Sequence, residues 1–349
     1  MPFLSDDEKA AISINRMIFH VVGKTADDLK LLDEISPPQF TDFFVDRVKS
    51  ALRGNLFEFR ERSKAEALIR SIASDASVFT EKSQDLASEF QNQHYSVTSA
   101  GVFFVFELNV GNTEPIYALI KYDNEDVVRY LLKASSGPQV PRLERFHETF
   151  VRKPEAMQKI ALVRLAPGEG GSIMVRDRSN TAHISDYFER FLQARRVNSP
   201  DDLSEKLAEA FKDTFKDHRA SLPEDIQKSG VNRIYEVLRQ GGHRFDPDDC
   251  EPLITAIFGQ VEEDAPLRKT LARKLKDRGV SEETFDINPE KIRKPSRLRI
   301  ETEEGTQILF DEGNRPAIRR LEDGRQEIVV VTARVTRDDV DIEKRPRGN

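Results

Sequence analysis

Two apolar runs joined by a short turn constrain the fold of this chain more than any other feature. They lie in Gly101–Asp123, on either side of the turn residues Gly111, Asn112 and Pro115. Both runs are short and rich in β-branched and aromatic side chains, as strands are. Val102–Phe106 has no polar residue on either face, so we expect both of its sides to be covered, as at the centre of a sheet. The sequence therefore predicts an antiparallel hairpin at the heart of the fold.

The segments around this hairpin predict more strands and a layer of helices. Apolar residues alternate through 12–22, which favours another strand of the same sheet. Helical spacing of apolar residues predicts helices at Pro37–Arg53, Ser63–Ala76 and Thr80–His94. The polar stretch Ser135–Lys153 is interpreted as a connection with a short helix at most. Two further strands are expected, on either side of a glycine-rich turn at 167–171: Lys159–Leu165 and Ser172–Arg176.

The second half of the chain predicts a helical subdomain followed by a small β region. Ser199 and Pro200 are a helix start signal, and Leu203, Leu207, Phe211 and Phe215 follow at four-residue spacing. Further helices are expected at Glu224–Arg239, Pro247–Phe258 and Pro266–Arg278, and a β meander of three or four strands after Gly279. The fold class is therefore α+β, with a central antiparallel or mixed sheet. The predicted divisions are an N-terminal domain at 1–178, a helical subdomain at 179–280, a β meander with a basic loop at 281–340 and a disordered tail at 341–349.

Composition limits the classes of function. The chain has 349 residues, a net charge of −7 and a pI of about 5.6, so binding of nucleic acid requires a local basic patch. A single cysteine, Cys250, excludes an internal disulfide and favours a reducing cytosol. No apolar run is as long as a membrane span, and the acidic start lacks the pattern of a signal peptide. We therefore expect a cytoplasmic protein that does not enter a membrane.

The search for catalytic chemistry gives weak candidates. One kind of metal-dependent nuclease carries a metal-binding acid on a hairpin and a lysine two residues later. Glu107 is the candidate acid, but Asn109 stands where the lysine is needed. On the other run, Lys121 comes before Asp123 rather than after it. The six histidines and Cys250 have no metal-ligand spacing, so no metal or other cofactor is expected. No serine or cysteine nucleophile motif is present, and the glycines at 167–171 lack the Gly-Lys-Ser/Thr of a phosphate-binding loop.

One histidine lies within a predicted strand. His20 is either a ligand or base, or a structural strand histidine with one hydrogen bond. The second interpretation is favoured because no cysteine or other histidine lies near it in sequence.

The most informative feature is a group of basic residues near the carboxyl end. Such a density of lysine and arginine neutralises phosphates and releases counterions without regard to sequence. Pro295 keeps the middle of the group out of a helix, as in a loop that follows a nucleic-acid backbone. The alternative is a solvated face paired with acids such as Glu301, Glu303 and Glu304. The candidate contact residues are Arg273, Lys274, Lys276, Lys291, Arg293, Lys294, Arg297, Arg299, Arg319 and Arg320.

The order of these segments resembles the bacterial nucleoid-associated protein family of the NdpA/YejK type. The resemblance is carried by the opening strand from Ile14 to His20, the hairpin 101–120, the strand Lys159–Arg164 and the helix Ser185–Leu192. The helix at 203–215 and the closing β segment stand at matching places, so the resemblance covers most of the chain. The chain differs in its linkers and in its long basic C-terminal segment.

The resemblance implies a cytoplasmic protein of the nucleoid that binds double-stranded DNA with little sequence preference, as a homodimer and without catalytic residues. Two alternatives remain open. One is an interaction subunit of an anti-phage defence complex or of a topoisomerase-associated complex. The other is the metal-dependent nuclease considered above.

Overall fold

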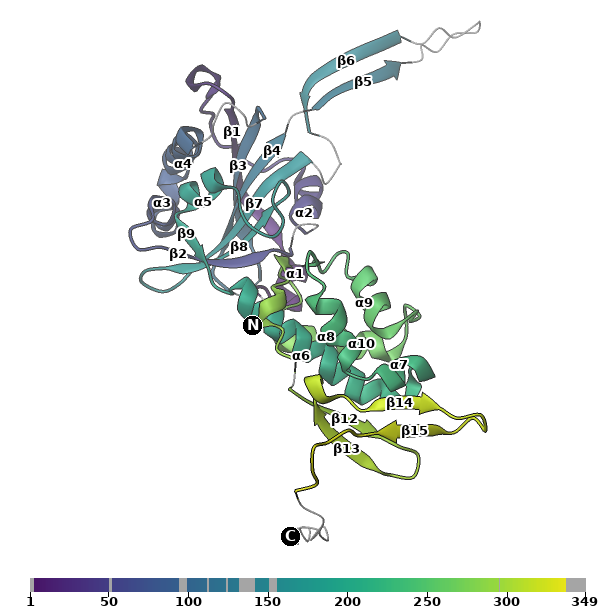
Figure 1. Cartoon of the computed structure of the whole chain (residues 1–349). Helices are drawn as coiled ribbons and strands as arrows, with labels where there is room; N and C mark the ends of the chain where they lie inside the picture. Colours follow the sequence, from purple (N-terminus) through teal and green to yellow (C-terminus); the bar gives the residue numbers. More distant parts are fainter. Residues whose placement is uncertain are drawn as a thin grey trace, which may run out of the picture. The chain divides into compact units, whose positions relative to one another are not determined.

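The chain forms two compact units, Met1–Ile292 and Arg293–Asn349, which we call the first and the second unit. This computed structural model describes residues 3–49, 52–93, 99–111, 113–123, 125–131, 142–150, 156–294 and 296–336, with the backbone alone at 125–131 and 142–149 (Figure 1). The predicted tail at 341–349 therefore lies outside the described residues. The predicted domain boundaries stay a prediction.

The first unit is built on a seven-stranded sheet in which every neighbouring pair is antiparallel. The strand order is β1-β3-β4-β7-β8-β2-β9. The strands are β1 (Ser13–Val22), β2 (Asn55–Phe59), β3 (Gly101–Asn109), β4 (Ile116–Asp123), β7 (Met157–Leu165), β8 (Gly171–Asp177) and β9 (Ala194–Arg196). The predicted hairpin is confirmed as β3–β4, which lies inside the sheet with residues 101–108 of β3 fully buried.

Helices cover both faces of this sheet (Figure 1). One face packs against α3 (Lys64–Ser74), α4 (Phe79–Gln93) and α5 (Asp186–Leu192), through residues such as Ile69, Phe90 and Phe188. The opposite face packs against α2 (Thr41–Lys49) through Phe44 and Val48. Because β3 presents Phe103 to one side and Phe104 to the other, its unbroken apolar sequence is explained by two separate cores.

A third core in the first unit is helical, as predicted. It is formed by α6 (Pro200–His218), α7 (Glu224–Ser229), α8 (Asn232–Arg239), α9 (Glu251–Phe258) and α10 (Pro266–Asp277). The start signal is confirmed, since Ser199 Oγ accepts a hydrogen bond from Asp202 N at 3.1 Å and Pro200 is the first residue of α6. The short strands β10 (Arg244–Phe245) and β11 (Phe285–Asp286) pair with each other, and the 3₁₀ turn η5 (Pro289–Lys291) follows.

The short helix α1 (Asp6–Ala11) precedes β1 and was not predicted. Ser5 caps it, because the Ser5 side chain accepts from Glu8 N and the Glu8 carboxylate accepts from Ser5 N.

The second unit contains two hairpins. The strands are β12 (Arg297–Glu301) with β13 (Gln307–Asp311), and β14 (Ala317–Arg320) with β15 (Gln326–Val329). The strand positions at Leu298, Ile308 and Ile328 were predicted. The four strands form two separate two-stranded sheets rather than one continuous meander, because β13 pairs with β12 and not with β14.

Four further sequence expectations need correction. The helix expected from Pro37 begins only at Thr41, since Phe40 has a left-handed backbone (φ 52°) and is 79 % exposed. Helix 224–239 is broken into α7 and α8 at Gly230, whose φ is 60°. The segment Pro247–Phe258 becomes helical only at Glu251, because Asp249 N bonds to Asp246 O in a preceding turn.

The fourth correction concerns the stretch expected to be a connection at 135–153. Part of it is the strand β6 (Arg142–Thr149), which pairs with β5 (Glu125–Leu131) outside the seven-stranded sheet. Only Leu143 and Phe146 of its 8 residues are apolar and they do not alternate with polar ones, so the strand lacks both an apolar run and a period of two.

Candidate nucleic-acid interface

Four of the ten predicted contact residues lie in the first unit, and three of these four are ion-paired. Lys274 Nζ lies 2.7 Å from Asp217 Oδ2, and Lys276 Nζ lies 3.4 Å from Asp6 Oδ2. Lys291 Nζ lies 3.1 Å from Asp201 Oδ2. Arg273 is exposed and has no ion-pair partner within the described residues. The basic face of α10 is therefore largely neutralised by acids that are distant in sequence.

The pKa shifts of the carboxyl groups in these pairs also indicate that the lysines are neutralised. The hydrogen bond from Lys274 lowers the pKa of the Asp217 carboxyl, and the hydrogen bonds from Asn288 and Lys291 lower the pKa of Asp201. Both carboxylates thus stay ionised beside their lysines near neutral pH. A phosphate approaching Lys274 or Lys291 has to compete with a carboxylate that is already in place.

The other six predicted residues lie in the second unit, and four of them are available. Arg293, Arg297, Arg319 and Arg320 are exposed, and in the described part of the chain none has an ion-pair partner. Lys294 is half-buried and makes an interaction of its own. Arg299 contacts Glu301 at 3.6 Å, at the outer limit of an ion pair.

Strand geometry groups these arginines by face. Arg297 and Arg299 are two residues apart on β12 and share one face, whereas Leu298 between them is buried on the other. Arg319 and Arg320 are adjacent on β14 and occupy opposite faces. The second unit thus presents cations on both of its hairpins.

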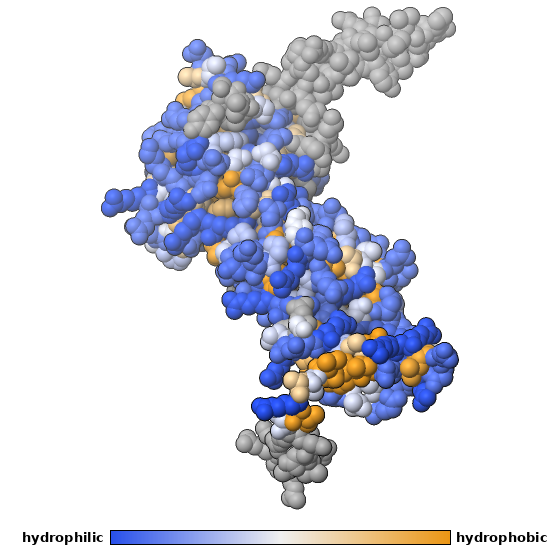
Figure 2. All heavy atoms as spheres, viewed as in Figure 1, coloured by the Kyte–Doolittle hydropathy of each residue, from blue (hydrophilic) through white to orange (hydrophobic). Residues whose placement is uncertain are grey.

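Exposed apolar side chains accompany these cations. Among the described residues, nine large hydrophobic side chains are exposed, and six of them belong to the second unit. Figure 2 shows hydrophobic residues gathered beside strongly hydrophilic ones on β12–β15. The six are Leu309, Ile318, Leu321, Val330, Val331 and Val335.

Two of the residues tested for nuclease chemistry, Glu107 and Lys121, are buried in the first unit. Glu107 is 8 % exposed and accepts a hydrogen bond from the side chain of Asn15. Lys121 Nζ pairs with Asp123 Oδ1 at 2.6 Å, and burial lowers the pKa of this lysine. Among the described residues, no group of three or more histidine, cysteine, aspartate or glutamate side chains has the arrangement of a metal site.

A polar row crosses the sheet beside these residues. In register, His20 lies opposite Phe103, and the row continues through Lys121, Lys159 and Asp177. Lys159 pairs with Asp177, which also accepts hydrogen bonds from the backbone or side chain of Ser179, Asn180 and Ser185. The Lys159–Asp177 pair is almost completely enclosed, so it holds β7, β8 and the loop at 177–185 together.

His20 is a structural histidine. Its Nδ1 accepts a hydrogen bond from Leu32 N at 3.1 Å, and its Nε2 lies 3.1 Å from Ser83 Oγ. The ring is fully buried, and desolvation lowers its pKa to about 4. The imidazole is therefore neutral in the folded protein at physiological pH, and its two hydrogen bonds fix a loop and α4 against β1.

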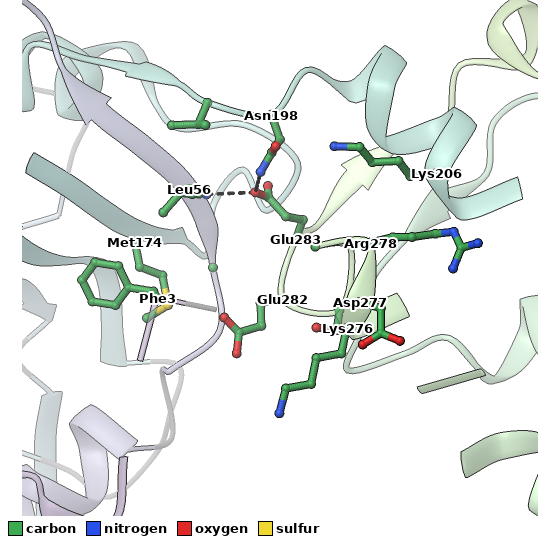
Figure 3. Close-up of a pocket in the computed structure, with 14 residues that line it drawn as sticks. Phe3, Leu56, Met174, Asn198, Lys206, Lys276, Asp277, Arg278, Glu282 and Glu283 are labelled. Carbon is green, nitrogen blue, oxygen red and sulfur yellow. Dashed lines mark hydrogen bonds between the residues drawn. The ribbon is translucent and has the colours of Figure 1, made fainter. Parts of the chain in front are cut away.

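A pocket of about 320 Å³ lies in the first unit between the sheet and the helical core (Figure 3). Glu283 anchors its wall, because its carboxylate accepts hydrogen bonds from Leu56 N at 3.2 Å, Asn198 Nδ2 at 2.7 Å and Arg196 Nη2 at 2.9 Å. Lys9 pairs with Glu282 at 2.7 Å in the same wall. Both glutamates of this wall thus have partners, and the hydrogen bonds of Glu283 join strand β2 to the segment that follows α10.

Comparison with protein families gives a match over most of the chain. The sequence model described as nucleoid-associated protein YejK matches residues 18–331 of the 349. The chain belongs to this family. The match begins inside β1 and ends after β15, so it includes both units. A search among curated proteins found no match.

Membership in the nucleoid-associated family confirms the resemblance seen in the sequence. Within the described residues, no helix is long and apolar enough to cross a membrane.

Sequence reasoning missed the difference in availability between the two groups of cations. The partners of Lys274, Lys276 and Lys291 are far away along the chain, and only folding brings them close. Nearby acids give no signal either: Asp311 lies opposite Arg297 and Glu327 lies opposite Arg319 in the hairpins, yet within the described residues neither forms an ion pair with that arginine.

Proposed function

We propose that this protein binds double-stranded DNA without catalysis and with little sequence preference, and that the second unit makes the principal contacts. One observation carries the proposal: in a chain of the nucleoid-associated family, the second unit exposes Arg293, Arg297, Arg319 and Arg320 without carboxylate partners among the described residues. The proposed location is the nucleoid in the cytoplasm.

The physical reason is local availability of positive charge. The whole chain carries a net charge of −7, so its long-range field repels DNA. Binding therefore depends on arginines that reach phosphates directly and release condensed counterions. Contacts with phosphates position a protein on the duplex but carry no sequence information, which accounts for the proposed lack of preference.

The test is DNA binding by a charge-reversed variant, measured by fluorescence anisotropy. Arg293, Arg297, Arg319 and Arg320 are each changed to Glu. We expect affinity to fall on the order of 100-fold, because phosphate contacts are replaced by repulsion. Unchanged affinity would exclude the second unit as the DNA-binding surface.

The matched control reverses four exposed cations of the first unit: Lys24, Arg62, Arg239 and Lys269, each to Glu. Both variants have the same net charge, so a general field effect weakens them equally. The proposal expects the control to keep its affinity within a few-fold. Repeating the assay with magnesium and examining the DNA for cuts tests the absence of catalysis: magnesium-dependent cleavage that is lost in Glu107→Ala would establish the nuclease alternative.

A second candidate function is that of an interaction subunit, and the exposed apolar side chains of the second unit favour it. A protein partner in a chromosome-maintenance or defence complex would cover such a surface. Capture of a partner that survives nuclease treatment and is lost on changing Val330 and Val331 to Ser supports this candidate. We also propose a homodimer, as the resemblance implies; a light-scattering mass of one chain at micromolar concentration would exclude it.

A further inference from the structure

We propose that the second unit bends DNA by inserting aliphatic side chains between base pairs from the minor groove. The inference rests on the proposed DNA-binding function and specifies its mode. The proposed wedges are Leu309 and Ile318, each with an arginine beside it.

The first wedge is defined by the pairing of β12 with β13. Leu309 lies directly opposite Arg299, and Arg297 lies opposite Asp311 on the same face of the hairpin. The apolar residues Leu298, Ile300, Ile308 and Phe310 occupy the other face. Leu309 is thus the apolar residue on a face of mixed charge, which carries two arginines and the acids Glu301 and Asp311, and it is 66 % exposed.

The second wedge lies on β14. Ile318 pairs with Ile328 of β15, and Arg320 follows two residues later on the same face. Ile318 is 46 % exposed, and Leu321, just after Arg320, is also exposed. Each hairpin therefore presents an aliphatic side chain with a guanidinium as its immediate neighbour.

This combination matches the chemistry of architectural DNA-binding proteins. Apolar wedges such as leucine and isoleucine unstack a base step and kink the duplex by roughly 20–90°, while arginines bind in the minor groove beside them. A wedge needs exposure, and the arginine must not be held by a carboxylate. Leu309 and Ile318 meet the first condition. Arg320, beside Ile318, meets the second within the described residues. Arg299, opposite Leu309, lies 3.6 Å from Glu301, so the available arginine at the first wedge is Arg297, the diagonal neighbour of Leu309.

Charge complementarity favours DNA over protein as the occupant of this surface. The fully buried centre of a protein interface is depleted in charge, with polar groups at its rim. Here Ile318 shares its face with Arg320, Ile328 and Gln326, so the face carries a cation and no acid. The matching partner is polyanionic with an apolar interior, as a stack of base pairs is.

The experiment uses the full chain and a duplex of about 30 base pairs with a fluorophore pair at its ends and 2-aminopurine at several central steps. We expect the wild-type protein to raise both energy transfer and 2-aminopurine emission, which report bending and unstacking. Changing Leu309 and Ile318 to Ser should abolish both signals but leave the salt dependence of binding unchanged. The control changes Leu31 and Val197 to Ser; these are exposed to a similar degree on the first unit and should leave both signals intact.

Three outcomes would overturn the inference. These are a wild-type complex in which the bound DNA stays straight, a serine variant that bends DNA as well as the wild type, and a serine variant whose only change is in oligomeric mass. In each of these the proposed function survives if salt-dependent binding persists. Loss of binding itself in the wild type would instead remove the proposed function.

Discussion

The two units of this chain use their charges and apolar residues in opposite ways. In the first unit, cations reach carboxylates from distant segments: Arg196 pairs with Glu283, Lys9 with Glu282 and Arg278 with Asp213. In the second unit, which is far smaller, the predicted contact residues Arg293, Arg297, Arg319 and Arg320 have no such partner among the described residues. Six of the nine large hydrophobic side chains exposed among the described residues are also found there. The difference indicates that the paired charges of the first unit stabilise the fold, whereas the unpaired arginines of the second unit are available to a ligand.

The largest expected effect concerns a buried ion pair of the first unit. Asp177→Ala leaves the Lys159 ammonium enclosed without its partner, so we expect the free energy of unfolding to fall by about 3–5 kcal/mol. The measurement is a urea titration monitored by circular dichroism, because the chain has no tryptophan whose fluorescence would report unfolding. Arg319→Ala, on the exposed β14, should change stability by less than about 0.5 kcal/mol. Equal losses in the two variants would remove the distinction between the units.

The second effect concerns the joint between the sheet and the helical core. Glu283→Ala removes the acceptor for Leu56 N, Asn198 and Arg196, and the arginine is left half-enclosed. We expect a loss of about 1.5–3 kcal/mol in the same assay. Glu282→Ala, which removes the more exposed pair with Lys9, is the matched control and should cost less. A larger cost at Glu282 would contradict the assignment of Glu283 as the main anchor.

A third prediction is the pH dependence caused by His20. The pKa of His20 is about 4 in the folded chain and about 6.5 in the unfolded chain. Between these pH values the unfolded chain therefore binds a proton at His20 that the folded chain does not bind. Stability therefore falls as pH drops below about 6.5 and stops falling below about 4. Between pH 7.5 and 5.5 the loss attributable to His20 is about 1.3 kcal/mol.

His20→Gln should remove this part of the pH dependence, whatever its effect on stability at pH 7.5. The measurement is a set of urea titrations at both pH values for the two proteins. An unchanged pH dependence in the variant would show that other groups cause the effect.

The sequence predicted those elements whose signals lie in residues adjacent in the chain. The hairpin 101–123 and the start of α6 were predicted because apolar runs and capping residues are adjacent in the chain. Strand β2 was missed because it has only five residues, and its alternation in Asn55–Phe59 includes a buried asparagine. The break at Gly230 was missed because helical spacing of apolar residues continues across it.

The candidate site was predictable only in part. The concentration of arginine and lysine is visible in the sequence, but the acids that neutralise Lys274 and Lys276 come from α6 and from the start of the chain. Neighbours in space decide which cations stay available, and spacing along the chain does not reveal them. The exposure of Leu309 and Ile318 likewise depends on which face of each hairpin is covered.

The smallest expected effect is on stability in the second unit. Leu309→Ser should change the free energy of unfolding by less than about 0.5 kcal/mol, because the side chain is already exposed. The equivalent change in the helical core, Leu207→Ser, should cost several times more, since Leu207 is fully buried. A large loss at Leu309 would mean that this residue serves folding rather than a ligand.

The availability of charge in the second unit is tested most directly by the salt dependence of DNA binding. The logarithm of the association constant is plotted against the logarithm of salt concentration for the wild type, for the variant with Arg293, Arg297, Arg319 and Arg320 changed to Glu, and for the first-unit control. The account predicts that the magnitude of the slope falls by about 3–4 in the second-unit variant, close to 0.9 for each lost phosphate contact, and stays unchanged in the control. Equal slopes in the wild type and the second-unit variant, or a fall confined to the control, would contradict it.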